Sequence, residues 1–249
     1  MPKYFVPQDV INDDVVTVRD DNARHLIKVL RAKTGDEIII CDGNRNDYFC
    51  EIEKIERDEN IISMRVVERR ACISEPPAKI TLYQSAVRAD KMEFIIQKCV
   101  ELGVGEIAPV KTERSGPSDS GKKTARFRKI AESAAGQSMR GIVPLVREPV
   151  SFEEALTDST NDEKLSLVAY ENERVNNISG VLKDIRPRSL SIWVGPEGGF
   201  AEREIECLLR RGARCVTLGS RVLRTETAGL TALIKVLTIW EELMWQTAR

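Results

Sequence analysis

The sequence predicts an α/β protein in two parts, a small β-rich part over residues 1–73 and a larger part over residues 79–249. The stretch SEPPAK at residues 74–79 places two prolines between charged, strand-like sequence and a new apolar run, which indicates a boundary. Beyond this boundary, short apolar runs alternate with amphipathic helical patterns, as in a parallel sheet covered by helices. The 249 residues, 42% hydrophobic and 31% charged, are enough for two modest globular domains.

The first part begins with a predicted helix and continues with three predicted strands. The helix is ARHLIKVLRAKTGD, ending near Gly35, with Arg24, Lys28 and Arg31 on one face and Leu26, Val29 and Leu30 on the other. Its basic face is either solvated surface or a ridge that contacts phosphates. The strands, which show β-type enrichment or alternation, are IIICDG (38–43), YFCEIEKI (48–55) and IISMRVVE (61–68).

The second part alternates strands and helices. Strand ITLYQSA precedes helix DKMEFIIQKCVELG, in which Met92, Ile95, Ile96 and Cys99 recur at helical spacing and Gly103 is placed to end the helix. Next come strand EIAPV, a basic segment and helix FRKIAESAAGQSMR. The runs LSLVAY (165–170), LSIWV (190–194) and RCVTL (214–218) are typical of strands buried on both faces. Ligands of such an open sheet bind at the carboxyl ends of its strands.

Several classes of protein are disfavoured by composition. His25 is the single histidine, which removes most Ser-His-Asp schemes and the two-histidine metal motifs. The six cysteines are scattered singly, so we expect no metal site and no disulfide framework. No segment approaches the roughly 20 apolar residues of a membrane helix, and the start MPKYFVPQDV lacks the apolar core of a signal peptide. We expect a cytosolic protein.

The net charge of -1 hides a basic island, because residues 111–147 carry 9 basic and 3 acidic side chains. Charge runs are usually solvated surface, and contact with a nucleic-acid backbone is the alternative.

The stretch GPEGGFAEREIE, residues 195–206, follows an apolar run and opens a helix. It matches neither the Walker loop nor the dinucleotide loop. Glu197, Glu202 and Glu204 would repel an anion 4 to 6 Å away by roughly 3 to 4 kcal/mol each at an effective dielectric near 20, and no lysine offsets this. We therefore expect a ligand that is neutral or positive where it touches the loop. A glycine turn needed only for strand-helix geometry is the alternative.

The stretch LGSRVLRTETAGL, residues 218–230, leads from a strand into a helix that continues to about Met244. Thr225 is a candidate N-cap, and Glu226 is favourably placed in the first turn. The helix is apolar over most of its circumference, which indicates burial by its own domain or by a partner subunit. Arg221 and Arg224 need another explanation, because a tight turn does not require arginine.

Together, WVGPEGGFAEREIE and LGSRVLRTETA resemble the paired C-terminal signature of the SPOUT methyltransferases, and more narrowly that of the RsmE-type 16S ribosomal RNA uridine-N3 methyltransferases. HLIKVLRAKTGDEIIICDG is similar to the N-terminal PUA-like domain of that family, and KMEFIIQKCVELGVGEIAPV and RFRKIAESAAGQSMRGIVP to its later segments. The resemblance implies a PUA-like RNA-binding domain, a SPOUT domain whose C-terminal chain forms a trefoil knot, and a homodimer. It implies methylation of N3 of a specific uridine in 16S rRNA, as naked RNA or within the small subunit.

The resemblance also implies S-adenosylmethionine as cofactor, held by the backbone of three loops. This cofactor has no phosphate and carries a sulfonium cation, which agrees with the acidic loop. The implied cofactor-binding residues are Val168, Ala169, Gly195, Pro196, Gly198, Gly199, Leu218, Gly219, Ser220, Val222, Leu223 and Thr227.

Methylation of N3 requires loss of a weakly acidic imide proton. Arg224 is the candidate that stabilises the developing anion, and Glu226 or Glu197 accepts the proton; helix capping is the alternative role of Glu226. The candidate RNA-binding residues are Arg24, Lys28, Arg31, Arg114, Lys122, Lys123, Arg126 and Arg140. Alternatives for the whole protein are a knotted RNA-binding assembly factor without catalysis, a SPOUT enzyme acting on another RNA base, and an ordinary doubly wound nucleotide-binding enzyme.

Overall fold

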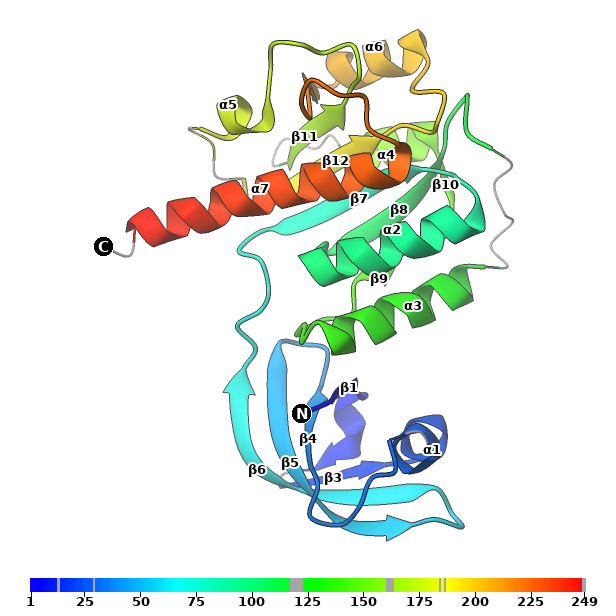
Figure 1. Cartoon of the computed structure of the whole chain (residues 1–249), viewed down its shortest axis with the longest axis vertical. Coiled ribbons are helices and arrows are strands. Elements are labelled where there is room, and N and C mark those ends of the chain that lie inside the picture. The colour runs from blue at the N-terminus through cyan, green and yellow to red at the C-terminus, as the bar shows by residue number, and fades with distance from the viewer. Residues whose placement is uncertain are drawn as a thin grey trace. The chain divides into compact units, whose positions relative to one another are not determined.

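The computed structural model describes residues 1–12, 14–28, 30–116, 123–159, 164–183, 185 and 187–247. It divides the chain into two compact units. The first unit comprises Met1–Glu75 and Ala135–Val143, and the second comprises Pro76–Ala134 and Pro144–Arg249. Figure 1 shows the β-rich first unit and the α/β second unit, which are taken one at a time below.

The first unit is built on a six-stranded sheet in the order β1-β4-β5-β6-β3-β2. Its strands are β1 (Lys3–Phe5), β2 (Ile11–Asn12), β3 (Val15–Val18), β4 (Glu37–Cys41), β5 (Asn46–Glu56) and β6 (Ile61–Ala71), with the 3-10 turn η1 (Gln8–Val10) between the first two. Neighbours are antiparallel except β1 and β4, which are parallel. The three predicted strands are confirmed as β4, β5 and β6. Their inward side chains, including Ile40, Ile52, Ile62 and Met64, are fully buried.

Helix α1 (Asp20–Lys28) is shorter at its C-terminal end than the sequence predicts. The chain leaves the helix where the Ala32 N–H donates to the Leu26 carbonyl at 3.1 Å, and Arg31 adopts a left-handed φ of 55°. Such a closure ends a helix although glycine is its usual residue. Arg31 therefore does not share a helical face with Arg24 and Lys28. Leu26 is buried as predicted, Leu30 is exposed, and Val29 lies outside the described residues.

The second unit contains a parallel sheet in the order β10-β8-β7-β12-β11-β13, with β9 beside β8 (Figure 1). The strands are β7 (Lys79–Ser85), β8 (Glu106–Lys111), β9 (Leu145–Val146), β10 (Val150–Ser151), β11 (Lys164–Ala169), β12 (Ser189–Val194) and β13 (Arg214–Val216). Every registered pair is parallel, which confirms the predicted open α/β sheet. The carboxyl ends of β7, β12, β11 and β13 consequently meet at one edge.

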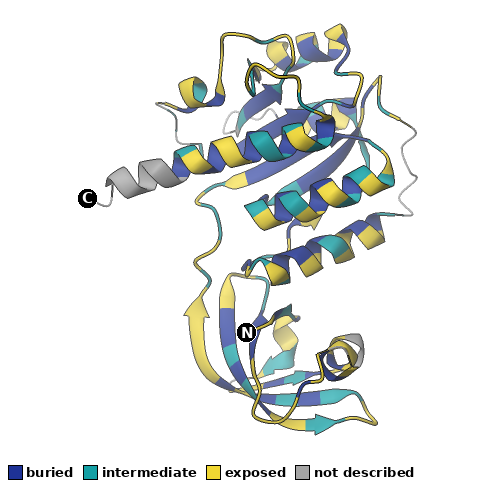
Figure 2. Ribbon diagram, in the orientation of Figure 1, coloured by how far each residue is buried: buried dark blue, intermediate teal, exposed yellow. Residues whose placement is uncertain are grey.

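Helices α2 (Ala89–Leu102), α4 (Phe152–Ser159), α5 (Ile178–Leu182), α6 (Glu202–Arg210) and α7 (Thr225–Thr247) belong to the second unit, as does most of α3 (Thr124–Gln137). In α2 the predicted apolar positions are buried, and Gly103 ends the helix with a φ of 111°. Helices α2 and α7 pack against each other, and Figure 2 shows buried strands behind them. Within the described residues no helix could span a bilayer.

An aromatic cluster forms the core beneath the loop that follows β12. Trp193 stacks on Tyr83 with ring centroids 4.7 Å apart, and its edges meet Phe152 and Phe200. Phe200 belongs to the stretch GPEGGF and is 4% exposed. The loop is therefore anchored at its C-terminal end by a buried ring.

Helix α7 begins differently from the prediction. The Arg224 carbonyl accepts the first hydrogen bonds of the helix, from the Thr227 and Ala228 N–H groups, so Arg224 and not Thr225 is the capping residue. On one face Leu233, Val236, Leu237 and Trp240 are buried, as expected, whereas Ile234 on another face is 47% exposed.

Candidate functional site

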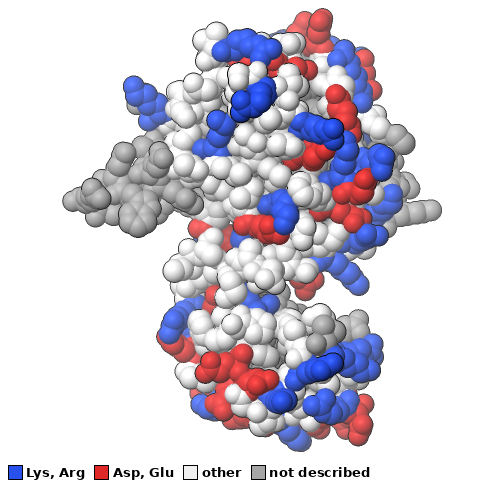
Figure 3. All heavy atoms as spheres, in the orientation of Figure 1, with Lys and Arg blue, Asp and Glu red and all other residues white. Residues whose placement is uncertain are grey.

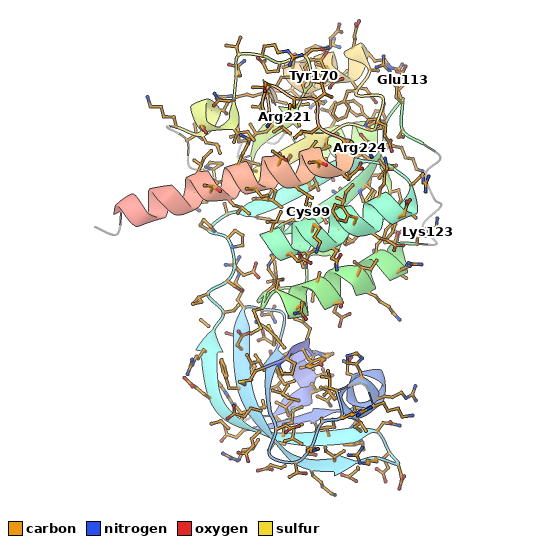
Figure 4. All side chains as sticks on the ribbon, in the orientation of Figure 1. Cys99, Glu113, Lys123, Tyr170, Arg221 and Arg224 are labelled. Carbon is orange, nitrogen blue, oxygen red and sulfur yellow. The ribbon has the colours of Figure 1, made fainter. Side chains whose placement is uncertain are left out.

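Three loops at the carboxyl edge of the parallel sheet enclose a cavity of about 590 Å³. They follow β11, β12 and β13, and the first residues of α2 and α7 complete the wall. The cavity is lined by Lys91, Ala169, Tyr170, Glu171, Arg174, Val194, Gly195, Pro196, Glu197, Gly198, Gly199, Thr217, Leu218, Gly219, Arg221, Val222, Leu223, Arg224, Thr225 and Ala228. Figure 4 shows Tyr170, Arg221 and Arg224 at this end of the second unit.

Most of the expected cofactor-binding residues lie in this wall. The exceptions are Val168, which is fully buried in the core, and Ser220 and Thr227, which are not among the lining residues. Sequence reasoning missed Tyr170, Glu171 and Arg174. Their only signal was their place at the end of the strand-like run LSLVAY, for Tyr170, or just after it, for Glu171 and Arg174.

Two glycines of the loop after β12 leave little room for a side chain. Gly199 has a φ of 68°, donates its N–H to the Pro196 carbonyl at 3.0 Å, and would place a Cβ 2.3 Å from a Glu171 oxygen. A Cβ on Gly195 would lie 3.2 Å from the Phe200 backbone nitrogen. The glycines thus serve the turn itself and leave the backbone bare toward the cavity.

The same loop is braced from outside the cavity. Arg114 donates from Nη1 to the carbonyl oxygens of Gly198 at 3.1 Å and Phe200 at 3.3 Å. Glu204 is buried, and its carboxylate accepts from the Ala201 and Glu113 N–H groups at 2.9 Å each. The Glu204 carboxylate therefore has a structural role. Arg114, which was expected to contact RNA, supports the loop.

The start of α7 is joined to the loop after β12 by a buried polar relay. The Thr225 hydroxyl donates to the Gly195 carbonyl at 2.6 Å and accepts from Gln84 Nε2 at 2.9 Å. Gln84 is fully buried at the end of β7, and Thr225 is 5% exposed. Three segments far apart in the sequence are thereby fixed to one another at the cavity wall.

Lys91, on the first turn of α2, contacts both candidate proton acceptors. Its Nζ donates to Glu197 Oε1 at 2.8 Å and lies 3.6 Å from Glu226 Oε2. This hydrogen bond lowers the pKa of the Glu197 carboxyl and raises the pKa of Lys91. The expectation that no lysine offsets the acidic loop is therefore wrong, because the compensating lysine comes from a distant helix.

The lining as a whole is basic. It contains Lys91, Arg174, Arg221 and Arg224 against the acidic side chains Glu171 and Glu197. The expectation of an acidic site is therefore wrong, and the charge of the lining does not by itself select a cationic ligand. The excess of basic side chains favours contact with a polyanion.

The candidate RNA-binding residues are dispersed. Arg24 and Lys28 are exposed on α1, where Figure 3 shows basic side chains gathered on the first unit, and Arg31 is exposed beyond its end. Arg126 pairs with Glu93 at 2.7 Å, and Lys123 begins the turn before α3. Lys122 lies outside the described residues.

The expectation that Arg140 contacts RNA is wrong. Arg140 is 2% exposed, and its guanidinium forms a bidentate pair with the buried Glu75, at 2.9 and 2.7 Å. A guanidinium enclosed in this way is not presented to a phosphate backbone, so Arg140 is removed from the RNA-binding set.

A metal site is not found in the part of the chain that the structure describes, where no group of three or more His, Cys, Asp or Glu side chains could hold an ion. Cysteines 41, 50, 72, 99, 207 and 215 are all free.

Comparison with known proteins decides the family. A family model described as an RNA methyltransferase domain matches residues 74–237, and one described as an RNA methyltransferase PUA domain matches residues 18–63. The ribosomal RNA small subunit methyltransferase E of Bacillus subtilis is 33% identical over 245 residues, which cover 94% of each chain. The chain belongs to the ribosomal RNA small subunit methyltransferase E family. The resemblance noted from the two C-terminal motifs is confirmed.

Solved structures of methyltransferases agree. The small subunit methyltransferase E from Neisseria gonorrhoeae, bound to S-adenosyl methionine, is 35% identical, with a TM-score of 0.86 over 96% of this chain and 98% of that one. A methyltransferase from Legionella pneumophila, in complex with the bound cofactor SAM, is 27% identical, with a TM-score of 0.81 over 95% and 96%. As a member of the family, the chain is an RNA methyltransferase with a PUA-like domain and an α/β methyltransferase domain.

Proposed function

We propose that this protein transfers the methyl group of S-adenosylmethionine to N3 of a specific uridine in small-subunit ribosomal RNA. The observation that carries the proposal is the cavity at the carboxyl edge of the sheet, whose wall joins bare backbone to Arg224. Its volume, about 590 Å³, is within the usual range for a cofactor site.

The residues of the wall fit this cofactor. Gly195 and Gly199 leave backbone exposed where a Cβ would crowd Phe200 and Glu171, which suits a flat adenosyl group held by peptide N–H and carbonyl groups. When bound, S-adenosylmethionine supplies an electrophilic methyl group on a positively charged sulfur. The proposed contacts are the expected residues that line the cavity, from Ala169, the stretch at 195–199 and the stretch at 218–223.

Side chains of the protein would accept the proton and stabilise the developing negative charge. Arg224, exposed in the cavity wall, stabilises the anion that forms as the uracil ring loses its N3 proton. Glu197 lines the cavity and Glu226 does not, so Glu197 is the proposed proton acceptor. This carboxylate would take the proton from N3. N3 would then bond to the methyl carbon that the cofactor supplies, while the carbon–sulfur bond breaks and its electron pair stays on the sulfur.

RNA would approach along basic surface. The proposed contacts are Arg24, Lys28 and Arg31 of the first unit and Lys122, Lys123 and Arg126 of the second, together with the basic lining. Neutralising several phosphates makes binding strongly salt-dependent. A flat salt profile with small-subunit RNA would contradict this part of the proposal.

The proposal includes a cytoplasmic homodimer and a trefoil knot. Ile234, an apolar side chain of α7 that is 47% exposed, supports a partner subunit. The return of the chain from edge strand β13 to Gly195, beside central strand β12, supports threading of the C-terminal segment.

Cofactor binding separates this proposal from two of its three alternatives, the assembly factor and the nucleotide-binding enzyme. S-adenosylmethionine should raise the melting temperature and ATP should not, because a doubly wound nucleotide enzyme would respond to ATP and an assembly factor without catalysis to neither. Transfer of labelled methyl groups to small subunits from cells lacking the enzyme then completes the test. A protein stabilised by ATP alone would refute the proposal.

A further inference from the structure

The three charged side chains Glu226, Lys91 and Glu197 form a chain that runs from behind the cavity to its wall. Lys91 and Glu197 line the cavity, whereas Glu226 lies outside the lining with its side chain 17% exposed. Its Oε2 atom is buried without a hydrogen-bond partner, and Lys91 Nζ lies 3.6 Å from it. The ammonium is thus held between an enclosed carboxylate and one at the wall.

The three residues come from three separate segments. Lys91 stands on the first turn of α2, Glu197 in the loop after β12, and Glu226 on the first turn of α7. Each segment is anchored elsewhere: α2 by its buried face, and the other two by the Thr225 bond to the Gly195 carbonyl. A single ammonium between two anchored carboxylates fixes the orientation of both side chains.

We infer that Lys91 is a positioning residue of the methyl-transfer site, anchored by Glu226 and holding the Glu197 carboxylate in one orientation at the cavity wall. The inference rests on the proposed function, in which Glu197 accepts the proton. It assigns to Glu226 the task of holding Lys91, beyond favourable placement at a helix N-terminus.

Other charged groups near Glu197 do not replace Lys91. Arg88 also lowers the pKa of Glu197, but its guanidinium is paired with Asp90 at 3.0 Å. Arg221 and Arg224 line the same cavity, but among the contacts that the structure describes, the side-chain hydrogen bond and ion pair of Glu197 are made with Lys91. Lys91 makes the hydrogen bond that most strongly lowers the pKa of Glu197.

The test uses the full-length protein and three variants of α2. Lys91→Met removes the charge, Lys91→Arg keeps it, and Lys98→Met is the matched control, because Lys98 pairs with Glu101 on the same helix at 2.8 Å and does not line the cavity. The first readout is the titration of the Glu197 carboxyl by carbon-13 NMR, which does not depend on activity. Lys91→Met should move this titration to higher pH, and the other two variants should not.

The second readout is methyl transfer to small subunits. Lys91→Met should lower kcat by about tenfold to a hundredfold with little change in the KM for S-adenosylmethionine, because orientation of a proton acceptor affects the reaction step. The acidic limb of its pH profile should move upward, and Lys91→Arg should recover most of the rate.

An unchanged Glu197 titration in Lys91→Met would overturn the inference, as would a wild-type rate. If Lys91→Met does not fold, as judged by circular dichroism, Lys91→Gln removes the same charge and should shift the Glu197 titration in the same direction. No transfer by the wild-type protein would refute the proposed function and leave the NMR result as the test of Lys91.

Discussion

The backbone and the side chain of Arg224 have different roles. Its carbonyl accepts the first hydrogen bonds of α7, while its guanidinium is exposed in the cavity wall. Truncation to alanine removes the guanidinium and keeps the backbone carbonyl that caps α7. Arg224→Ala should therefore lower methyl transfer by about 100- to 1,000-fold while the affinity for S-adenosylmethionine, measured by calorimetry, stays nearly unchanged.

The control for Arg224→Ala is Arg211→Ala, at an exposed position just after α6 and outside the cavity lining. It should be as active as the wild-type protein. Equal turnover by Arg224→Ala would remove this arginine from the mechanism.

Gly199 combines a left-handed backbone with a crowded Cβ position, and Gly212 has the same kind of backbone with open space around it. Either residue changed to alanine should cost roughly 1 kcal/mol of folding stability, because alanine is strained at positive φ. Only Gly199→Ala also displaces the Glu171 carboxylate from the cavity wall. It should weaken S-adenosylmethionine binding in calorimetry; equal affinities of the two variants would contradict the cradle assigned to this loop.

The residue scale also shows where charge reasoning from sequence fails. The acidic stretch at 195–206 suggested an acidic site, because its carboxylates are adjacent in the sequence. The structure gives Glu204 two N–H donors and gives Glu197 a lysine 106 positions away. Arg140 fails as an RNA contact for the same reason, since its partner Glu75 is 65 positions away. Partners at such separations leave no local pattern.

At the scale of elements, a buried carboxylate is among the groups that hold the segment 135–143 in the first unit. Glu75 accepts from Arg140 and from the Gly141 N–H at 2.8 Å, and both charged side chains are almost fully buried. Glu75→Gln removes the carboxylate that pairs with the buried Arg140 guanidinium. The free energy of unfolding should fall by about 3 kcal/mol at neutral pH, as measured in urea.

This loss should depend on pH. Burial raises the pKa of the Glu75 carboxyl, but the hydrogen bonds and charge of Arg140 outweigh it and hold the pKa below its ordinary value. A depressed folded-state pKa gives stability that is present above about pH 4.3 and disappears as the pH falls through the folded value. The stabilities of wild type and Glu75→Gln should therefore converge in acid. Glu68→Gln, in an exposed pair with Arg70, should change little at any pH.

Helix α7 provides a prediction about assembly. Ile234 on α7 and Leu209 on α6 are equally exposed, at 47% and 48%. If α7 packs on a partner subunit, Ile234→Lys should shift the protein from dimer to monomer in analytical ultracentrifugation, because it buries a charge in an apolar contact. Leu209→Lys should remain dimeric, and a dimeric Ile234→Lys would place the interface elsewhere.

The periodicity of apolar residues predicted most helices and strands, but it missed strands that are too short to show a period. Strands β4 to β8 and β11 to β13 and helices α2, α3, α6 and α7 follow from apolar spacing and from glycines that end them. Strands β1, β2 and β3 have two to four residues, too few for an alternation to be visible. The end of α1 was misplaced because Arg31 adopts the left-handed conformation that the prediction reserved for Gly35.

At the scale of the whole molecule, the site follows from topology. Parallel strands in the order β7-β12-β11-β13 bring the ends of four distant segments to one edge, so the general location of the cavity could be predicted from the βα pattern. The strand order could not, because it depends on pairings between segments far apart in the chain. A knot is likewise invisible to periodicity, since connections normally avoid it. The expectation of a knot came from the resemblance of two motifs, as did the expected cofactor and the expected target base.

The central claim is the reaction itself. Small subunits from cells lacking the enzyme should be incubated with labelled S-adenosylmethionine and the purified protein, and the modified nucleotide mapped and identified by mass spectrometry. The account predicts one labelled uridine carrying its methyl group at N3, with labelling by Arg224→Ala about 100- to 1,000-fold slower. Label on another base, on another atom of uridine or on protein would contradict it.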